Sequence, residues 1–440
     1  MMSDGYTNPL SLPPTPDGWN VVAIEDICQN VTSGGTPLRS NQSFYEGGIY
    51  SWFKTQELKD SILYESEEKI TDKALEQSSA KLFPKGTVLM AMYGDGKTIT
   101  SLGILSKEAA TNQACCAMIP NPNLCDSRFL FYALKYHRDD FIQIASGGAQ
   151  RNLSGKLIRR FALNTPPLPE QRAIAHILGT LDDKIELNRR MNETLESMAR
   201  AIFKSWFVDF DPVRAKAEGR DTGLPEEIAD LFPDSFEETE LGEVPKGWKI
   251  KGLDEIAEYL NGLALQKYPP EEGKDTLPRI KIAQLKVGNT EGAEISTSEI
   301  PAEYIVKDGD VLFSWSGSLE VEIWCGGLGA LNQHLFKVTS KEYPKWFYYL
   351  WTKYHLPAFR DIAAHKATTM GHIQRKHLSE AKVLDSNSDL LKKIDECMEP
   401  LIERIIANNI ESRNLAELRD TLLPRLISGE LRVKEAEHAI

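Results

Sequence analysis

The stretch LPEQRAIAHILGTLDDKIELNRRMNETLESMARAIFKSWFVDF (168–210) decides the architecture of this chain. Its apolar residues recur at alternating steps of three and four, and no proline follows Pro169. This spacing predicts one long helix with a narrow apolar seam, close to a coiled-coil heptad pattern. Two polar residues, Asn188 and Asn192, interrupt that seam.

A second stretch, 389–428, repeats the first at a constant offset of 220 residues. A duplicated unit can fold about a pseudo-twofold axis, so the two seams are predicted to pair as an antiparallel coiled coil. Asn188 and Asn408 lie near the helix midpoints, where such an axis would let them hydrogen-bond and fix the register. The alternative, that each asparagine is solvated on a helix flank, stays open. The predicted seam residues are Leu181, Ile185, Asn188, Leu195, Ile202, Leu401, Ile405, Asn408, Leu415 and Leu422.

The duplication extends into the globular segments that precede the two helices. PDGW (16–19) returns as PKGW (245–248), TNQ (111–113) as LNQ (331–333), and FLFYALKYH (129–137) as FYYLWTKYH (347–355). The motifs recur in the same order over the whole chain, which indicates an internal duplication at the scale of a domain. The predicted fold class is α+β, with two pseudo-twofold-related α/β domains separated by two long helices.

At 440 residues the chain is too long for one hydrophobic core. Pro- and Gly-rich punctuation and the restart at Trp248 set the predicted boundaries. These are a first globular domain (1–166), a first long helix (167–210), an acidic connector (211–244), a second globular domain (245–387), a second long helix (388–430) and a C-terminal tail (431–440).

The net charge of −13 comes mainly from the first helix and the connector, so the near-neutral globular segments could each present a basic face. No apolar run has the length of a membrane span, and the N-terminus lacks the pattern of a signal peptide. The six cysteines show no zinc-site spacing. We therefore expect a cytoplasmic protein with free thiols and no bound metal.

Motifs for catalysis are incomplete in this sequence. GDGKT (94–98) resembles a phosphate loop, but that pattern requires glycine at position 91, where the residue is Ala91. The histidines of 365–377 fit no usual metal spacing, and no catalytic triad can be assembled. We expect no catalytic residues and no cofactor in this chain.

Polar loops with a few cations recur at equivalent places in the two globular segments. Gly and Ser allow close backbone approach, Arg and Lys meet phosphates, and Gln, Asn and Thr can bind base edges. These residue types favour contact with DNA, although ordinary surface loops have a similar composition. The candidate DNA-binding residues are Thr36, Arg39, Asn41, Tyr93, Lys97, Gln150, Arg151, Gln266, Lys267, Ser316, His365, Lys366, Thr368 and Thr369.

With these features in place, the chain resembles the specificity subunits of type I restriction-modification systems over essentially its full length. The resemblance is carried by PLPEQRAIAHILGTLDDKIELNRRMNETLESMARAIFKSWFVDFDPV (167–213), LFPDSFEETELGEVPKGW (231–248) and LRDTLLPRLISGEL (418–431). It implies two target-recognition domains, each binding half of a bipartite double-stranded DNA target. It also implies that the coiled coil sets the spacing and docks the other subunits.

The resemblance further implies that catalysis resides in partners. Two modification subunits would use S-adenosylmethionine to methylate adenine at N6, and two restriction subunits would use ATP and Mg²⁺. We expect the acidic side chains Asp182, Asp183 and Glu186 to form a protein-docking face. We also expect apolar residues beside the seam, Phe203, Trp206 and Phe207, to be exposed until partners bind. The alternative is a coiled-coil adaptor that binds proteins and has no DNA specificity.

Overall fold

The computed structural model describes residues 14–94, 98–145, 151–365 and 371–433. The chain divides into two compact units. Unit 1 comprises residues 1–184 and 415–440, and unit 2 comprises residues 185–414. Each unit therefore combines one globular segment with one part of each long helix. Within the described residues, no helix is both long and apolar enough to cross a membrane.

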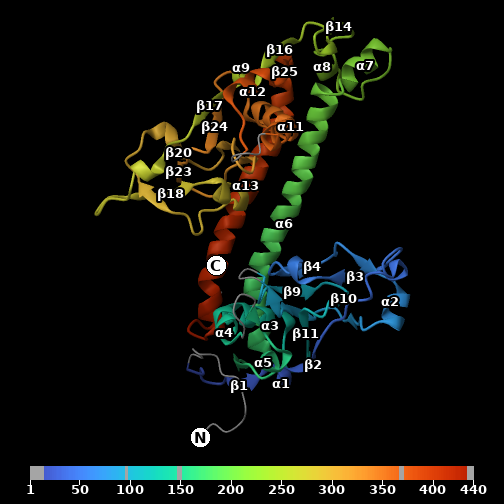
Figure 1. The fold of residues 1–440 in the computed structure, drawn as a ribbon, viewed down its shortest axis with the longest axis vertical. Helices are drawn as coiled ribbons and strands as arrows, with labels where there is room; N and C mark the ends of the chain where they lie inside the picture. The colour runs from blue at the N-terminus through green and yellow to red at the C-terminus, as the bar shows by residue number, and fades with distance from the viewer. Residues whose placement is uncertain (1–13, 95–97, 146–150, 366–370, 434–440) are drawn as a thin grey trace. The chain divides into compact units, whose positions relative to one another are not determined.

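The two long helices are present and have equal length. They are α6 (Leu168–Phe207) and α13 (Ser388–Ile427), each of 40 residues, and Figure 1 shows them as uninterrupted ribbons in green and red. Their start points differ by 220 residues, the offset of the sequence repeat. Prolines at the start of α6 cost little, because the first helical amides have no intrahelical acceptor. The prediction of two long helices is confirmed.

In unit 1, the first part of α6 pairs with the last part of α13. Leu178 and Leu181 share an apolar cluster with Leu422 and Leu426. Early residues of one helix contact late residues of the other, so the pairing is antiparallel. The predicted seam residues Leu181 and Leu422 are buried, and Leu415 is half-buried.

In unit 2, a polar layer crosses the helix pair. Asn188 and Asn408 are 0% and 1% exposed, which excludes the interpretation that they are solvated on the helix flanks. The Asn188 amide donates to the Asn408 carbonyl at 3.4 Å and to Glu411 at 2.8 Å, and the Asn408 amide donates to Asn192 Oδ1 at 2.8 Å. The remaining predicted seam residues of this unit are buried or half-buried: Ile185, Leu195, Ile202, Leu401 and Ile405.

Replacing Asn192 with alanine should lower the unfolding free energy by about 1–3 kcal/mol, because the buried Asn408 amide would lose its acceptor. Urea denaturation followed by circular dichroism would measure the change. Met198→Ala, an exposed site on the same helix, should change stability by less than about 0.5 kcal/mol. Equal urea midpoints for the Asn192→Ala and Met198→Ala variants would show that the polar layer does not stabilise the helix pair.

The globular part of unit 1, coloured blue to teal in Figure 1, is built from antiparallel and mixed sheets. Its sheets have strand orders β1-β13, β2-β11-β7-β9-β4, β5-β3-β10-β6 and β12-β8. The strands are β1 (Asn20–Ala23), β2 (Cys28–Ser33), β3 (Tyr50–Phe53), β4 (Ser61–Leu63), β5 (Lys69–Ile70), β6 (Leu82–Phe83), β7 (Val88–Ala91), β8 (Tyr93–Gly94), β9 (Leu102–Leu105), β10 (Ala109–Thr111), β11 (Cys115–Pro120), β12 (Arg151–Asn152) and β13 (Ala162–Thr165).

Unit 2 repeats most of this topology, with sheets β16-β25, β17-β24-β21-β22 and β19-β18-β23-β20, and it adds the hairpin β14-β15. Among the described residues it has no counterpart of β4, and an isolated bridge stands in place of β12-β8. The parallel pairing inside the sheet β5-β3-β10-β6, between β10 and β3, recurs in the sheet β19-β18-β23-β20, between β23 and β18. The structure therefore shows the domain duplication. The strands are β14 (Phe236–Thr239), β15 (Gly242–Pro245), β16 (Lys249–Gly252), β17 (Glu258–Asn261), β18 (Thr276–Ile280), β19 (Ile295–Thr297), β20 (Ile305–Val306), β21 (Val311–Ser314), β22 (Val321–Ile323), β23 (Gly329–Leu331), β24 (Leu335–Thr339) and β25 (Lys382–Asp385).

Shorter helices pack against these sheets. In unit 1 they are α1 (Ile24–Ile27), α2 (Asp72–Gln77), α3 (Ser127–Tyr136), α4 (Arg138–Ile144), α5 (Gly155–Arg159), η1 (Gln42–Phe44) and η2 (Thr55–Glu57). In unit 2 they are α7 (Asp211–Ala217), α8 (Glu226–Ala229), α9 (Leu253–Ile256), α10 (Ile282–Val287), α11 (Lys345–Ala364), α12 (Arg375–Glu380), η3 (Leu265–Lys267) and η4 (Ala302–Tyr304).

The aromatic end of α6 is buried, which corrects the expectation that it is exposed. Phe203, Trp206 and Phe207 are 4%, 9% and 0% exposed and belong to the main core of unit 2. The connector supplies the cover, because its Phe232 and Val244 enter the same core. The segment 211–244 is thus part of a folded core in unit 2, and Phe203, Trp206 and Phe207 are buried in that core.

Candidate nucleic-acid interface

In unit 1, a glycine loop lies directly against a tight turn between two strands. The loop follows β2, and a Cβ on Gly34 would come closer than 3.0 Å to the Thr111 carbonyl oxygen. The Gly35 amide donates to the same carbonyl at 2.9 Å. The turn after β10 is closed by Asn112, whose side-chain oxygen accepts from the Ala114 amide at 3.1 Å. This is an Asx turn, a conformation that asparagine favours.

The exposed residue at the tip of this turn, Gln113, connects two of the predicted site residues. The hydroxyl of Thr36 donates to the Gln113 side-chain oxygen. Tyr93 lies in the short strand β8, which follows β7, and its hydroxyl donates to the Gln113 backbone carbonyl at 3.2 Å. Burial raises the pKa of Tyr93, so this hydroxyl stays protonated and can act as the donor. Thr36 and Tyr93 therefore meet at one junction.

The same junction is present in unit 2. A Cβ on Gly262 would come closer than 3.0 Å to the Asn332 carbonyl oxygen. The Asn332 side-chain oxygen accepts from the His334 amide at 3.3 Å, and the Gln333 amide donates to the Leu263 carbonyl at 2.8 Å. The predicted site residue Ser316 is 3% exposed, and its hydroxyl lies 2.9 Å from His334 Nδ1.

A short backbone pairing joins each junction to a later segment, which follows α4 in unit 1 and α11 in unit 2. In unit 1, Tyr93 pairs with Asn152, and in unit 2, Ser316 pairs with His372. The backbone of Arg151 pairs with Gly94. Five other candidates lie outside the described residues, as does the Arg151 side chain. These candidates are Lys97, Gln150, Lys366, Thr368 and Thr369.

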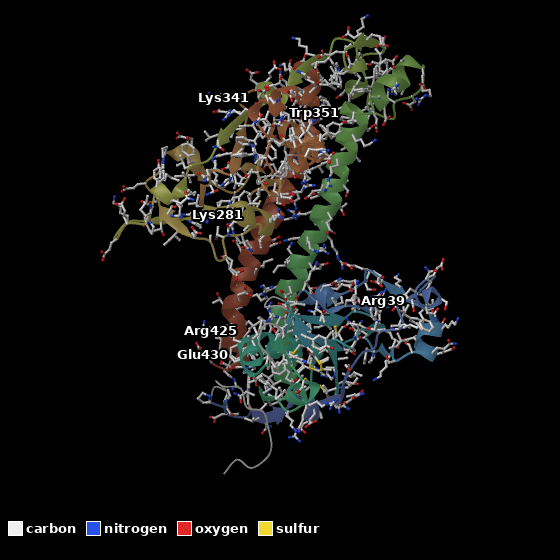
Figure 2. All side chains as sticks on the ribbon, in the orientation of Figure 1. Arg39, Lys281, Lys341, Trp351, Arg425 and Glu430 are labelled. Carbon is white, nitrogen blue, oxygen red and sulfur yellow. The ribbon has the colours of Figure 1, made fainter. Side chains whose placement is uncertain are left out.

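Arg39, marked on the blue part of the ribbon in Figure 2, is half-exposed and already has partners in its own unit. Its guanidinium pairs with Glu68 and lies 4.7 Å from the Trp52 ring centroid. Hydrogen bonds from Arg39 and Lys54 lower the pKa of Glu68, which keeps the carboxylate ionised. Arg39 is therefore held by groups of its own unit.

The remaining candidates lie on short elements away from the hydrogen bonds of the two junctions. Asn41 caps η1, where its side chain accepts from the Ser43 amide at 3.2 Å. Gln266 and Lys267 are exposed on η3. His365 ends α11, and its Nδ1 lies 2.7 Å from the Asp361 carbonyl.

Sequence reasoning missed the arginines that border the junctions. Arg159 donates to the Val31 carbonyl on the edge strand β2 at 2.9 Å, and Arg375 donates to the Tyr259 carbonyl on β17 at 3.2 Å. Val31 pairs with Met118 and Tyr259 with Val338, so the two carbonyls occupy equivalent positions. The two arginines come from different positions of α5 and α12, so the sequence repeat could not identify them. They cover the edge strands with exposed positive charge.

The acidic side chains expected to dock partners are engaged within their own units. Asp183 pairs with Arg128 through two hydrogen bonds of 2.7 and 2.9 Å. Asp182 accepts from Tyr132 at 2.7 Å and from Arg419 at 2.6 Å. Glu186 pairs with its helix neighbours Arg189 and Arg190. Charge reversal at Asp182 or Asp183 would disrupt the packing of the first domain on its helices, so it cannot test docking alone.

The chain contains two copies of one α+β domain. Each copy has the same loop junction and packs on long antiparallel helices. This arrangement defines a recognition protein with duplicated recognition domains. Residues 16–197 match the family described as "Type I restriction modification DNA specificity domain". The chain is similar to the specificity subunits of type I restriction-modification systems over nearly its whole length, and the family that matches residues 16–197 is one of DNA specificity domains.

Relatives match nearly the whole chain. The type I restriction enzyme MjaIX specificity subunit of Methanocaldococcus jannaschii is 28% identical over 96% of this chain and 95% of its own length. The HindI specificity subunit of Haemophilus influenzae is 27% identical over 71% of this chain and 79% of its own length. A crystal structure of a type I S subunit from M. genitalium has a similar fold, with a TM-score of 0.58 and 18% identity, covering 96% of this chain and 99% of that one.

Proposed function

We propose that this chain is the DNA-specificity subunit of a type I restriction-modification complex and that each globular domain binds one half of a bipartite target. The observation that carries the proposal is the repeated junction of a glycine loop, an Asx turn and a strand end in both units. Such a junction presents the amide side chains of Gln113 and Gln333 at the tips of its turns, and amide groups can bind base edges in the major groove. Exposed arginines beside each junction can contact phosphates.

The paired helices α6 and α13 would set the spacing between the two half-sites and bind the other subunits. The partners would be two modification subunits that use S-adenosylmethionine to methylate adenine at N6, and two restriction subunits that use ATP and Mg²⁺. In this proposal the chain itself holds no cofactor, and catalysis resides in the partners. The support is the similarity to type I specificity subunits together with the two 40-residue helices.

The test is a map of methylated adenines in a strain that contains this chain and in a strain that lacks its gene. We expect a bipartite motif, with one methylated adenine in each half, that disappears with the gene. Exchanging residues 19–163 for the corresponding segment of a relative should change one half of the motif and leave the other half intact.

Two results would contradict the proposal. One is an unchanged methylome in the deletion strain when the modification subunit is expressed. The other is a domain exchange that alters both halves together. If the chain also failed to retain duplex DNA in a mobility-shift assay with its modification subunit, the adaptor alternative would be favoured.

A further inference from the structure

We propose that Gln113 and Gln333 bind equivalent base positions in the two half-sites with opposite hydrogen-bond polarity. Gln113 would present a donor to its base, and Gln333 would present an acceptor. This inference rests on the proposed function and specifies the chemistry that each domain recognises. The occupant is the major-groove edge of one base pair in each half-site.

Strand register shows that the two glutamines are equivalent. The residue three positions after Gln113 is Cys116, which pairs with the last residue of β2, Ser33. The residue three positions after Gln333 is Phe336, which pairs with the last residue of β17, Asn261. Each glutamine also follows an asparagine that closes an Asx turn. Both amides therefore project from the same point of the same fold.

The polarity of Gln113 is set by Thr36. The Thr36 hydroxyl donates to the Gln113 side-chain oxygen, which orients the amide plane. No partner of the Gln113 side-chain nitrogen is present among the described residues, and Gln113 is exposed. Both N–H groups of this amide are therefore left to contact a ligand, whereas one of the two lone pairs of its oxygen is already used.

The polarity of Gln333 is set by a chain of two hydrogen bonds. Its side-chain nitrogen lies 3.3 Å from His334 Nε2, and an amide nitrogen can only donate, so this imidazole nitrogen accepts. The other imidazole nitrogen, Nδ1, then carries the proton and donates to the Ser316 hydroxyl at 2.9 Å. Ser316 is buried, which fixes the far end of the chain. The Gln333 side-chain carbonyl oxygen has no partner among the described residues, and it is left to contact a ligand together with the second N–H of the amide.

These polarities select different sets of bases. In the major groove, a side-chain N–H donor fits the N7 of either purine, the O6 of guanine or the O4 of thymine. A side-chain oxygen acceptor fits the N6 amine of adenine or the N4 amine of cytosine. We therefore expect Gln113 to contact a hydrogen-bond acceptor of a base in the first half-site. We expect Gln333 to contact the exocyclic amine of a base in the second half-site.

The experiment uses the chain assembled with its modification subunits and measures binding to the methylome-defined duplex and to duplexes with single base-pair changes. The readout is the ratio of affinities for matched and changed duplexes, because this ratio cancels uniform effects of added charge. The variants are Gln113→Ala, Gln113→Glu, Gln333→Ala and Gln333→Glu. Gln77→Glu, an exposed glutamine on α2, is the charge-matched control and should leave every ratio unchanged.

Both alanine variants should lower discrimination about 10- to 100-fold at one base pair of their own half-site, with the other half-site unaffected. Gln113→Glu should lose discrimination as fully as Gln113→Ala, because the carboxylate has no donor. Gln333→Glu should keep its base preference, because the acceptor remains.

Two results in the alanine variants would overturn the assignment of these residues to base recognition. One is binding that is weakened equally for all duplexes, and the other is an unchanged ratio of affinities for matched and changed duplexes. Loss of discrimination in Gln333→Glu equal to that in Gln333→Ala would overturn the assigned polarity. If the unmodified complex binds all duplexes equally, the proposed function itself has failed, which is a different result from any of these.

Discussion

Replacing Phe207 with alanine should lower the unfolding free energy of unit 2 by about 3–5 kcal/mol, the usual range for removing a buried aromatic side chain. Phe207 is 0% exposed, and its ring lies 5.5 Å from Trp248, 5.8 Å from Trp346 and 5.6 Å from Phe347, measured between centroids. The cavity would lie where α6, the connector and α11 share one core, so little collapse is possible.

Urea denaturation followed by tryptophan fluorescence would measure this change, because most of the tryptophans lie in unit 2. Leu187→Ala on the same helix is the matched control, since Leu187 is 53% exposed and should change stability by less than about 0.5 kcal/mol. If Phe207→Ala kept full stability but lost binding to modification subunits, the residue would serve docking rather than the core.

Replacing Gly34 with alanine should destabilise the first reading junction by about 3 kcal/mol, at the upper end of overpacking penalties. The added Cβ would overlap backbone atoms of Thr111 and Asn112, and backbone cannot rotate aside as a flexible side chain can. The loop would have to move away from the turn, which would separate Thr36 from Gln113. We therefore expect weaker binding to the first half-site and unchanged selectivity in the second.

Hydrogen exchange measured on peptides from residues 30–40 and 108–118 would report the loosening of the junction. Gly155→Ala is the control in the same unit, because a Cβ there meets no atom within 4 Å and alanine favours the helical conformation. Normal exchange protection and normal first-half binding in Gly34→Ala would show that the junction tolerates the displaced loop and does not position the reading residues.

The family and the helices were accessible from sequence because both depend on patterns that are local or repeated. A period near 3.6 residues identifies a helix wherever it occurs, and the constant offset of 220 identifies its copy. The duplicated TNQ and LNQ motifs also marked the turns that carry Gln113 and Gln333. Their role as the centre of each junction was not recognised, because a three-residue motif does not specify its neighbours.

Sequence by itself determined the presence of the two long helices, the duplication and the seam, since each follows from periodicity along the chain. Only the tertiary structure decided which polar groups meet. Thr36, Tyr93 and Gln113 are far apart in sequence and converge through strand pairing. Burial of Phe207 depends on a connector that folds back over α6. The availability of Arg39 depends on a carboxylate and two rings brought to it by the fold. Contacts of this kind depend on the position of every intervening element, and no local pattern encodes them.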